Sequence, residues 1–218
     1  MKKILTPGEA VKVIHDRASI MISGFMCCGQ ALRLVDALLE RGVKDLTVIT
    51  NDSGLPDRGV GKLIVAGRVR KLIVSHIGLN PEAGRKMNSG EMEVELVPQG
   101  TLAERIRCSG AGLGGVLTPT GIGTRVEDGK QKMRVGDSEY LLETPLHADF
   151  AFVKADVCDR YGNAFVAMSG KNFNTVMAMA AQHAILETDK LVEPGELDPE
   201  KVTIPGVFVN TIACEGRQ

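Results

Sequence analysis

The residues best placed to do chemistry lie in the segment "SGFMCCG", residues 23–29. Two thiols, Cys27 and Cys28, stand between two glycines at the point where an apolar run gives way to an amphipathic pattern. Three interpretations fit this arrangement: a metal or redox site, a cradle for an anion, or a plain tight turn. The thiols are considered first, because a thiolate is both a nucleophile and a metal ligand.

The cysteines do not form a metal-binding or disulfide pattern. The chain has five, with no Cys-x-x-Cys spacing: Cys27, Cys28, Cys108, Cys158 and Cys214. No histidine or further cysteine lies within five residues of the adjacent pair, so no metal site is expected. We expect the pair to pack as small hydrophobes rather than as nucleophiles. An odd set of unpaired cysteines favours a reducing compartment, and we expect a cytoplasmic protein.

An anion cradle is the stronger functional interpretation of residues 23–29. The segment follows a buried strand expected over 19–25 and precedes a helix expected over 30–41, with Gly42 as its C-cap. Ligands of parallel sheets bind beyond the carboxyl ends of the strands, and N–H groups at a helix N-terminus attract anions. Gly24 and Gly29 would let the backbone approach a phosphate, a carboxylate or a thioester oxygen closely. A turn that binds nothing remains the alternative.

A second glycine cluster, "GAGLGG" at 110–115, matches the spacing G-x-G-x-x-G. The dinucleotide fingerprint needs a strand before it and a helix after it. Here a helix is expected before the cluster and the non-helical stretch "VLTPTGIGT" follows it. We therefore expect a flexible loop over 109–124 that contacts a ligand or a second chain. The four histidines are scattered along the sequence, and no nucleophile or general base stands out.

Strand and helix patterns alternate four times in the first half of the chain. Further strands are expected over 45–52, 69–78 and 92–100, and further helices over 59–67, 80–90 and 101–108. In the last of these helices, Thr101 and Glu104 have capping-box spacing. Connections of this kind indicate a mainly parallel sheet with helices on its faces.

The second half of the chain does not continue the regular alternation of strand and helix patterns. A β-hairpin is expected over 130–143, turning near Gly136–Asp137. Strands are expected over 148–159, 162–169 and 183–188, a helix over 172–182, and a last strand in the tail at 194–210. We find no internal repeat, low-complexity segment or linker. The expected fold is α/β: one domain over 1–218, with an open, mainly parallel sheet flanked by helices and a β-hairpin insertion.

Bulk composition excludes several classes of protein. The chain has 218 residues, 44% of them hydrophobic and 24% charged, which is ordinary for a globular domain. A formal net charge of −1 argues against nucleic acid or an anionic membrane as the main partner. No apolar run approaches the ~18 residues of a transmembrane helix, and the N-terminus lacks the apolar core of a signal peptide.

Four stretches together resemble the α subunits of class I CoA-transferases, most closely those of the butyrate–acetoacetate and acetate–acetoacetate enzymes. They are "MISGFMCCGQA" (21–31), "NPEAGRKMNSGEMEVELVPQGTLAERIR" (80–107), "GAGLGGVLTPTGIGT" (110–124) and "KNFNTVMAMAAQ" (171–182). Ser23, Gln30 and Thr175 depart from the family pattern, which has glycine, a residue before proline, and proline near these positions. These departures leave the preferred acid open.

The resemblance implies an activity and a partner. Members move CoA between acids such as acetate, butyrate and acetoacetate by a ping-pong route through a glutamyl-CoA thioester. In two-subunit members the glutamate belongs to the β subunit, in a Ser-Glu-Asn-Gly stretch, and this chain has no Glu-Asn-Gly. The resemblance therefore implies no catalytic nucleophile in this chain, a β subunit as partner in an α2β2 assembly, and CoA as substrate with no permanently bound cofactor.

The resemblance also implies site residues. The CoA or acyl contacts fall on Ser23, Gly24, Phe25, Met26, Cys27, Cys28 and Gly29. We expect the N–H groups of 25–29 to stabilise the oxyanions of acyl transfer. Further substrate or interface contacts are expected at Gly112, Gly114, Gly115, Thr118, Thr120, Asn172 and Asn174, the two asparagines also capping the following helix. Two other functions stay open: an acyl-CoA hydrolase, and a binding module without turnover.

Overall fold

The computed structural model describes residues 1–215 and contains a central sheet of nine strands. The strands are β1 Lys3–Leu5, β2 Ser19–Ile22, β3 Leu46–Asp52, β4 Val69–His76, β5 Glu93–Leu96, β9 Ala148–Asp159, β10 Ala164–Phe165, β11 Ala181–Val192 and β12 Thr211–Ala213. Their order is β1-β12-β11-β9-β2-β3-β4-β5, and β10 pairs with β9. Every pair is parallel except β9–β10, so the expected open, mainly parallel sheet is confirmed.

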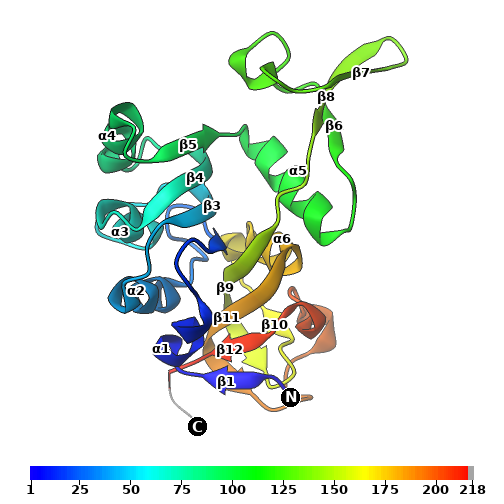
Figure 1. Ribbon diagram of the computed structural model, residues 1–218. Helices are drawn as coiled ribbons and strands as arrows, with labels where there is room; N and C mark the ends of the chain where they lie inside the picture. The colour runs from blue at the N-terminus through cyan, green and yellow to red at the C-terminus, as the bar shows by residue number, and fades with distance from the viewer. Residues whose placement is uncertain (216–218) are drawn as a thin grey trace.

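Six α-helices and five short 3₁₀ turns accompany the strands. The helices are α1 Pro7–Ala10, α2 Leu32–Arg41, α3 Val60–Val65, α4 Pro81–Ser89, α5 Gln99–Gly110 and α6 Asn174–Ala180. The 3₁₀ turns are Val11–Val13, Arg125–Glu127, Met168–Lys171, Pro199–Lys201 and Gly206–Phe208. Helices α1 to α4 cover one face of the sheet, and α5 and α6 lie on the other (Figure 1). The predicted C-cap at Gly42 is confirmed, with φ 79°.

Side-chain alternation in the strands divides the core into two layers. In β2, Ile20 and Ile22 pack under α1 to α4, whereas Met21 packs with α5 and α6. Because both faces of the sheet are covered, its central strands are apolar almost throughout. The carboxyl ends of β2 and β3 are thereby fixed side by side, with Ile22 paired to Thr50.

A separate three-stranded antiparallel sheet forms an arm that projects from the body (Figure 1). Its strands are β6 Val116–Thr118, β7 Lys132–Val135 and β8 Ser138–Glu143, in the order β6-β8-β7. The predicted hairpin is confirmed, because Val135 pairs with Ser138 around the two-residue turn. Strand β6 lies inside the stretch expected to be a loop and joins the arm to α5.

Several predicted boundaries were wrong. The strand expected over 162–169 pairs only at Ala164–Phe165, and the tail strand lies at Thr211–Ala213, beyond the expected range. Strand β11 is twice as long as predicted because it pairs with β9 along most of its length, taking over the end of the expected helix. A proline and a left-handed glycine shorten two other strands: β5 ends before Pro98 and β2 ends before Gly24, whose φ is 109°.

The capping box predicted at Thr101 and Glu104 was also wrong. Helix α5 begins two residues earlier than expected, with Pro98 at its N-cap, so Thr101 is the third helical residue. Its hydroxyl caps nothing and is buried without a hydrogen-bond partner. No helix in the described part of the chain is long and apolar enough to cross a bilayer.

Candidate functional site

Residues 23–29 form a tight turn at the carboxyl end of β2. Phe25 and Cys28 exchange two backbone hydrogen bonds, of 3.0 and 2.8 Å. The two residues between them, Met26 and Cys27, have φ values of 46° and 67°. Left-handed conformations at non-glycine residues are strained, and paired ones are typical of Asn-Gly turns. The contacts around the turn, rather than its own sequence, must therefore hold this shape.

The end of β3 holds one side of the turn. Asp52 is 2% exposed, and its carboxylate accepts hydrogen bonds from Met26 N at 2.9 Å and Gly54 N at 2.8 Å. Gln30 joins the first turn to the start of α3, donating to Ser23 O and accepting from Val60 N. Charge-assisted bonds from backbone N–H groups to a buried carboxylate are strong, so Asp52 fixes the turn firmly.

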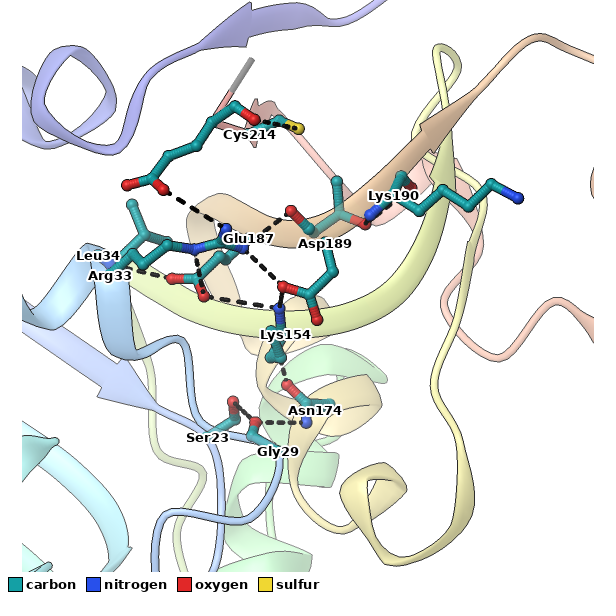
Figure 2. Close-up of polar contacts among 12 residues, drawn as sticks. Ser23, Gly29, Arg33, Leu34, Lys154, Asn174, Glu187, Asp189, Lys190 and Cys214 are labelled. Carbon is teal, nitrogen blue, oxygen red and sulfur yellow. Dashed lines mark hydrogen bonds and ion pairs between the residues drawn. The ribbon is translucent and has the colours of Figure 1, made fainter. Parts of the chain in front are cut away.

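Asn174 holds the other side of the turn (Figure 2). Its amide donates to Gly29 O at 2.8 Å and to Gly170 O at 2.6 Å, and its Oδ1 accepts from Lys154 N at 2.7 Å. The side chain is fully buried. Ser23 Oγ donates to the same Gly29 carbonyl at 3.1 Å. One asparagine thus joins the turn to β9 and to the 3₁₀ turn before α6.

Neither asparagine caps α6, so that prediction is corrected. Phe173 occupies the N-cap, where no side chain makes a cap hydrogen bond. Asn172 instead donates to Cys28 O at 3.1 Å and Ser169 O at 2.9 Å. The resemblance drew attention to both residues, but the turn that each one contacts, at Cys28 or Gly29, lies 144 or 145 residues away in sequence, out of reach of any local pattern.

The N-terminus of α2 is already occupied by a carboxylate of the chain itself. Glu187 in β11 is 2% exposed and accepts from Leu34 N at 3.0 Å and Arg33 Nε at 3.1 Å (Figure 2). Lys154 Nζ lies 3.6 Å from the same carboxylate. The expected anion cradle at this helix end is therefore filled by Glu187 and is not free for a ligand. An anion does lie at this helix end, but it is a carboxylate of the protein rather than the ligand that we expected.

Only part of the expected row of backbone donors is free. The N–H groups of Phe25 and Cys28 bond to each other's carbonyls, and that of Met26 bonds to Asp52. Within residues 1–215, nothing accepts from the N–H groups of Cys27 and Gly29. The prediction that all of 25–29 present donors is corrected to these two positions.

The two thiols lie in different surroundings. Cys27 is 8% exposed, its Sγ lies 3.8 Å from Arg58 O, and burial raises the pKa of its thiol. Cys28 is exposed, with Sγ 3.4 Å from Ser169 Oγ. Cys27, Cys28, Cys108 and Cys158 are free thiols. No group of three or more potential metal ligands is found among the described residues.

A cavity of about 490 Å³ opens beside the turn. Its lining residues are Phe25, Asn51, Gln99, Gly100, Ala103, Ser169, Asn172 and Phe173. Gln99 Nε2 donates to Asn51 Oδ1 at 2.8 Å, which places a fixed amide pair on an otherwise largely apolar wall. None of the lining residues is acidic, histidine or cysteine. The cavity can therefore bind and orient a carbonyl compound, and the hydroxyl of Ser169 on its wall has no carboxylate or histidine among the other lining residues to activate it.

Sequence reasoning missed Asn51 and Gln99 as site residues. Asn51 lies at the end of β3, and Gln99 begins α5 three residues after β5 ends, both on the side of the sheet where ligands of parallel sheets bind. Their position after predicted strands was the feature of the sequence that could have identified them. What the sequence lacked was any indication that α5 turns back toward β3 and brings the two side chains together.

Only part of the predicted glycine-rich loop lies near the site. Thr118 and Thr120 line a second cavity of about 320 Å³ between α5 and the base of the arm. Gly115 lies at this base, where a Cβ would come within 2.8 Å of Glu143 O. A Cβ on Gly112 or Gly114 would meet nothing within 4 Å, so the structure brings neither glycine against another element. Their contact with substrate or partner stays a prediction.

Comparison with known proteins gives a consistent result. The family model for coenzyme A transferase matches residues 4–215. The acetate CoA-transferase subunit alpha of Escherichia coli K12 is 54% identical over 210 residues, covering 96% of each chain. The acetoacetyl-CoA:acetate/butyrate CoA transferase alpha subunit of Clostridium acetobutylicum is 50% identical over 98% of each.

Solved structures show the same fold. An acyl-CoA transferase from Escherichia coli O157:H7, in a thioester complex with CoA, superposes with a TM-score of 0.86 at 23% identity. The match covers 98% of this chain and 47% of that one, so this chain spans about half of its length. Glutaconate CoA-transferase from Acidaminococcus fermentans gives a TM-score of 0.85 at 19% identity, over 97% of this chain and 75% of the other. Taken with the full-length sequence matches, these findings show that the chain belongs to the coenzyme A transferase family.

Proposed function

We propose that this chain is the α subunit of a two-subunit CoA-transferase that moves CoA between short-chain carboxylic acids such as acetate, butyrate and acetoacetate. Two relatives that are at least half identical bear the names of α subunits acting on these acids. The observation that carries the proposal is the cavity beside the strained turn. It has fixed polar groups for an acyl carbonyl, and its lining residues include no carboxylate, thiol or histidine.

The missing nucleophile is a glutamate of the β subunit. Its carboxylate attacks the thioester carbonyl, and the tetrahedral intermediate collapses to an acyl–glutamyl anhydride as CoA thiolate leaves. The thiolate then attacks the glutamyl carbonyl, releasing the first acid and leaving a glutamyl-CoA thioester. An incoming carboxylate reverses these steps and departs as the new acyl-CoA.

In this scheme the α subunit stabilises developing charge. The free N–H groups of Cys27 and Gly29 are the donors that residues 23–29 offer to an oxyanion. A single such donor is typically worth about 3–4 kcal/mol in the transition state. Asp52 and Asn174 keep the turn in place during turnover, because preorganised donors need no rearrangement as charge develops.

The β subunit covers the mouth of the cavity in an α2β2 assembly. Three large apolar side chains are exposed in this region: Phe25 at 46%, Met26 at 50% and Met168 at 86%. Met168, next to the cavity-lining Ser169, also has a left-handed φ of 44°. Exposed apolar groups beside an incomplete site favour burial by a partner.

Three further points belong to the proposal. CoA is a substrate rather than a resident cofactor. Residues 1–218 act as one unit. The location is cytoplasmic, which the free thiols of Cys27, Cys28, Cys108 and Cys158 support.

The test needs both chains. A neighbouring reading frame encoding about 200–220 residues with Ser-Glu-Asn-Gly would be co-expressed, and acyl-CoA products followed with butyryl-CoA or acetoacetyl-CoA and acetate. We expect acetyl-CoA only when both chains are present. Free CoA released without an acceptor would indicate a hydrolase, and binding without either reaction a non-catalytic module. Robust turnover by the isolated chain would contradict the placement of the nucleophile.

A further inference from the structure

The start of α2 is capped by a residue from another element. Ala31 occupies the N-cap and makes no side-chain hydrogen bond there, and no acidic residue follows in the first turn. The carboxylate of Glu187 in β11 instead accepts the hydrogen bond from Leu34 N, at 3.0 Å. An N-cap side chain normally accepts from the second or third N–H of its own helix. Glu187 therefore takes the place of a cap and fixes where α2 begins.

Glu187 is buried beside two cations, Lys154 and Arg33 (Figure 2). Only 2% of the residue is exposed, Lys154 Nζ lies 3.6 Å from its carboxylate, and Arg33 Nε donates to it at 3.1 Å. Replacing a buried ion pair by apolar side chains of similar volume often leaves stability unchanged, so stability alone does not account for these charges. The charges also supply direction, because charge-assisted hydrogen bonds are short and have a defined geometry.

Lys154 connects this cap to the anchor of the turn over residues 23–29. Lys154 and Glu187 are paired residues of the neighbouring strands β9 and β11. The main-chain N of Lys154 donates to Asn174 Oδ1 at 2.7 Å, and Asn174 in turn donates to Gly29 O at 2.8 Å. Gly29 is thus held through its carbonyl by Asn174 and through the helix that follows it by Glu187. The two restraints meet at Lys154.

We propose that Glu187 and Lys154 are positioning residues for acyl transfer. The buried pair holds the start of α2 against β9 and β11, and it thereby keeps the free N–H group of Gly29 at the place where an oxyanion forms. Neither residue lines the cavity beside the turn, so both act through the turn. The inference rests on the proposed function, because it assigns what keeps one of the proposed oxyanion donors in place.

The test uses the assembled α and β chains with butyryl-CoA and acetate. Glu187→Gln keeps the shape of the side chain and removes its charge. We expect kcat to fall about tenfold while the KM values for both substrates stay within about twofold, because a misplaced donor weakens binding of the transition state alone. Asp36→Asn is the matched control, since it removes the ion pair between Asp36 in α2 and Lys62 without touching the first turn of that helix. It should keep the wild-type kcat.

A double variant separates positioning from stability. Glu187→Leu combined with Lys154→Met removes both buried charges and keeps their volume, so its thermal midpoint should be at or above that of Glu187→Leu alone. Leu34 N still lacks the carboxylate in this variant, so kcat should stay about tenfold or more below the wild-type value. A kcat that returned to the wild-type value together with the thermal midpoint would show that the pair is only structural, and it would overturn the proposal.

The outcomes separate this role from the function itself. If the wild-type assembly transfers CoA to acetate and Glu187→Gln keeps the wild-type kcat, the positioning role is overturned and the proposed function stands. A rise in KM with kcat unchanged would also overturn the role, since the residue would then affect ground-state binding. If the wild-type assembly shows no acid-dependent transfer, both are overturned. A selective fall in kcat for Glu187→Gln and for the double variant, with Asp36→Asn unaffected, supports the proposal.

Discussion

Two turns of the molecule, over residues 23–29 and 53–59, follow the same sequence pattern. They differ in the contacts that maintain their shape. Each follows a neighbouring parallel strand, begins with Ser-Gly and ends in a glycine that precedes the next helix. Phe25 pairs with Cys28 in the first turn, and Leu55 with Arg58 in the second. The two segments share the seven-residue frame Ser-Gly-x-x-x-x-Gly.

The central residues of the two turns suit their conformations unequally. Met26 and Cys27 adopt left-handed φ values, whereas Pro56 and Asp57 do not. Proline at the first central position is typical of an ordinary type I turn. The second turn is therefore favoured by its own sequence. The first is imposed by Asp52 and Asn174, which is the pattern expected where strain is kept at a functional site.

The largest effect is expected at the last glycine of each turn. A Cβ on Gly29 would lie 2.6 Å from Gly170 O, a main-chain atom, and φ there is 72°. Left-handed strain and overpacking together predict a loss of about 4 kcal/mol in unfolding free energy for Gly29→Ala, measured by urea denaturation. Gly59→Ala meets the end of the Gln30 side chain rather than main chain, so the clash can be relieved by giving up the Gln30–Val60 hydrogen bond, and this variant should lose less. Equal losses would remove the distinction between the turns.

Loss of the anchor at Asn174 comes next. Asn174→Ala removes the hydrogen bonds to Gly29 O, Gly170 O and Lys154 N and leaves the last two without that partner, so we expect the unfolding free energy to fall by about 3 kcal/mol. The matched change in the second turn is Ser53→Ala, which removes one hydrogen bond to Ile77 O and should cost about 1 kcal/mol. A loss below that of Ser53→Ala would show that Asn174 does not hold the first turn.

Relief of strain at the turn centre should be a smaller effect of opposite sign. Met26 is half exposed, and asparagine tolerates a left-handed φ, so Met26→Asn should stabilise the protein by about 0.5 kcal/mol. Pro56→Asn in the second turn should destabilise by about as much, because proline restricts the unfolded chain. Thermal midpoints of the two variants and the wild type measure both. The same sign for both changes would contradict the comparison.

The smallest effects concern the thiols at the first turn. Because burial raises the pKa of Cys27 above its ordinary value of 9.0, the folded protein disfavours the thiolate. Any contribution of this group to stability is constant below the unfolded pKa and is lost as pH rises above it. Iodoacetamide labelling followed by mass spectrometry should modify exposed Cys28 near pH 8 and Cys27 only at higher pH. Cys28→Ser should keep substantial transferase activity, and a loss above about 10³-fold would instead indicate a thiol nucleophile.

Local sequence was enough for the elements that present the site. The period of apolar residues predicted β2, β3, β4 and β9, and Gly42 marked the end of α2. The hairpin of the arm followed from its Gly-Asp turn. These features depend on backbone preference and on which face of an element is apolar, and both are written within a few consecutive residues.

The partners of polar groups could not be predicted in this way. Glu187 and Leu34 are 153 residues apart, and Asn174 and Gly29 are 145 apart. A glutamate or an asparagine without such a partner would lie on the surface, in contact with water. From local sequence we therefore expected donors along 25–29 and caps at the asparagines, and in the structure most of those groups have other partners.

By itself the sequence determined an α/β sheet with a polar turn at the end of a strand. It also showed that the chain resembles one enzyme family. Only the tertiary structure decided that Glu187 fills the end of α2 and that Asp52 and Asn174 hold a strained turn. The physical reason is that backbone conformation responds to neighbouring residues, whereas a buried charge or amide is stable only where the folded chain brings its partner within hydrogen-bonding distance.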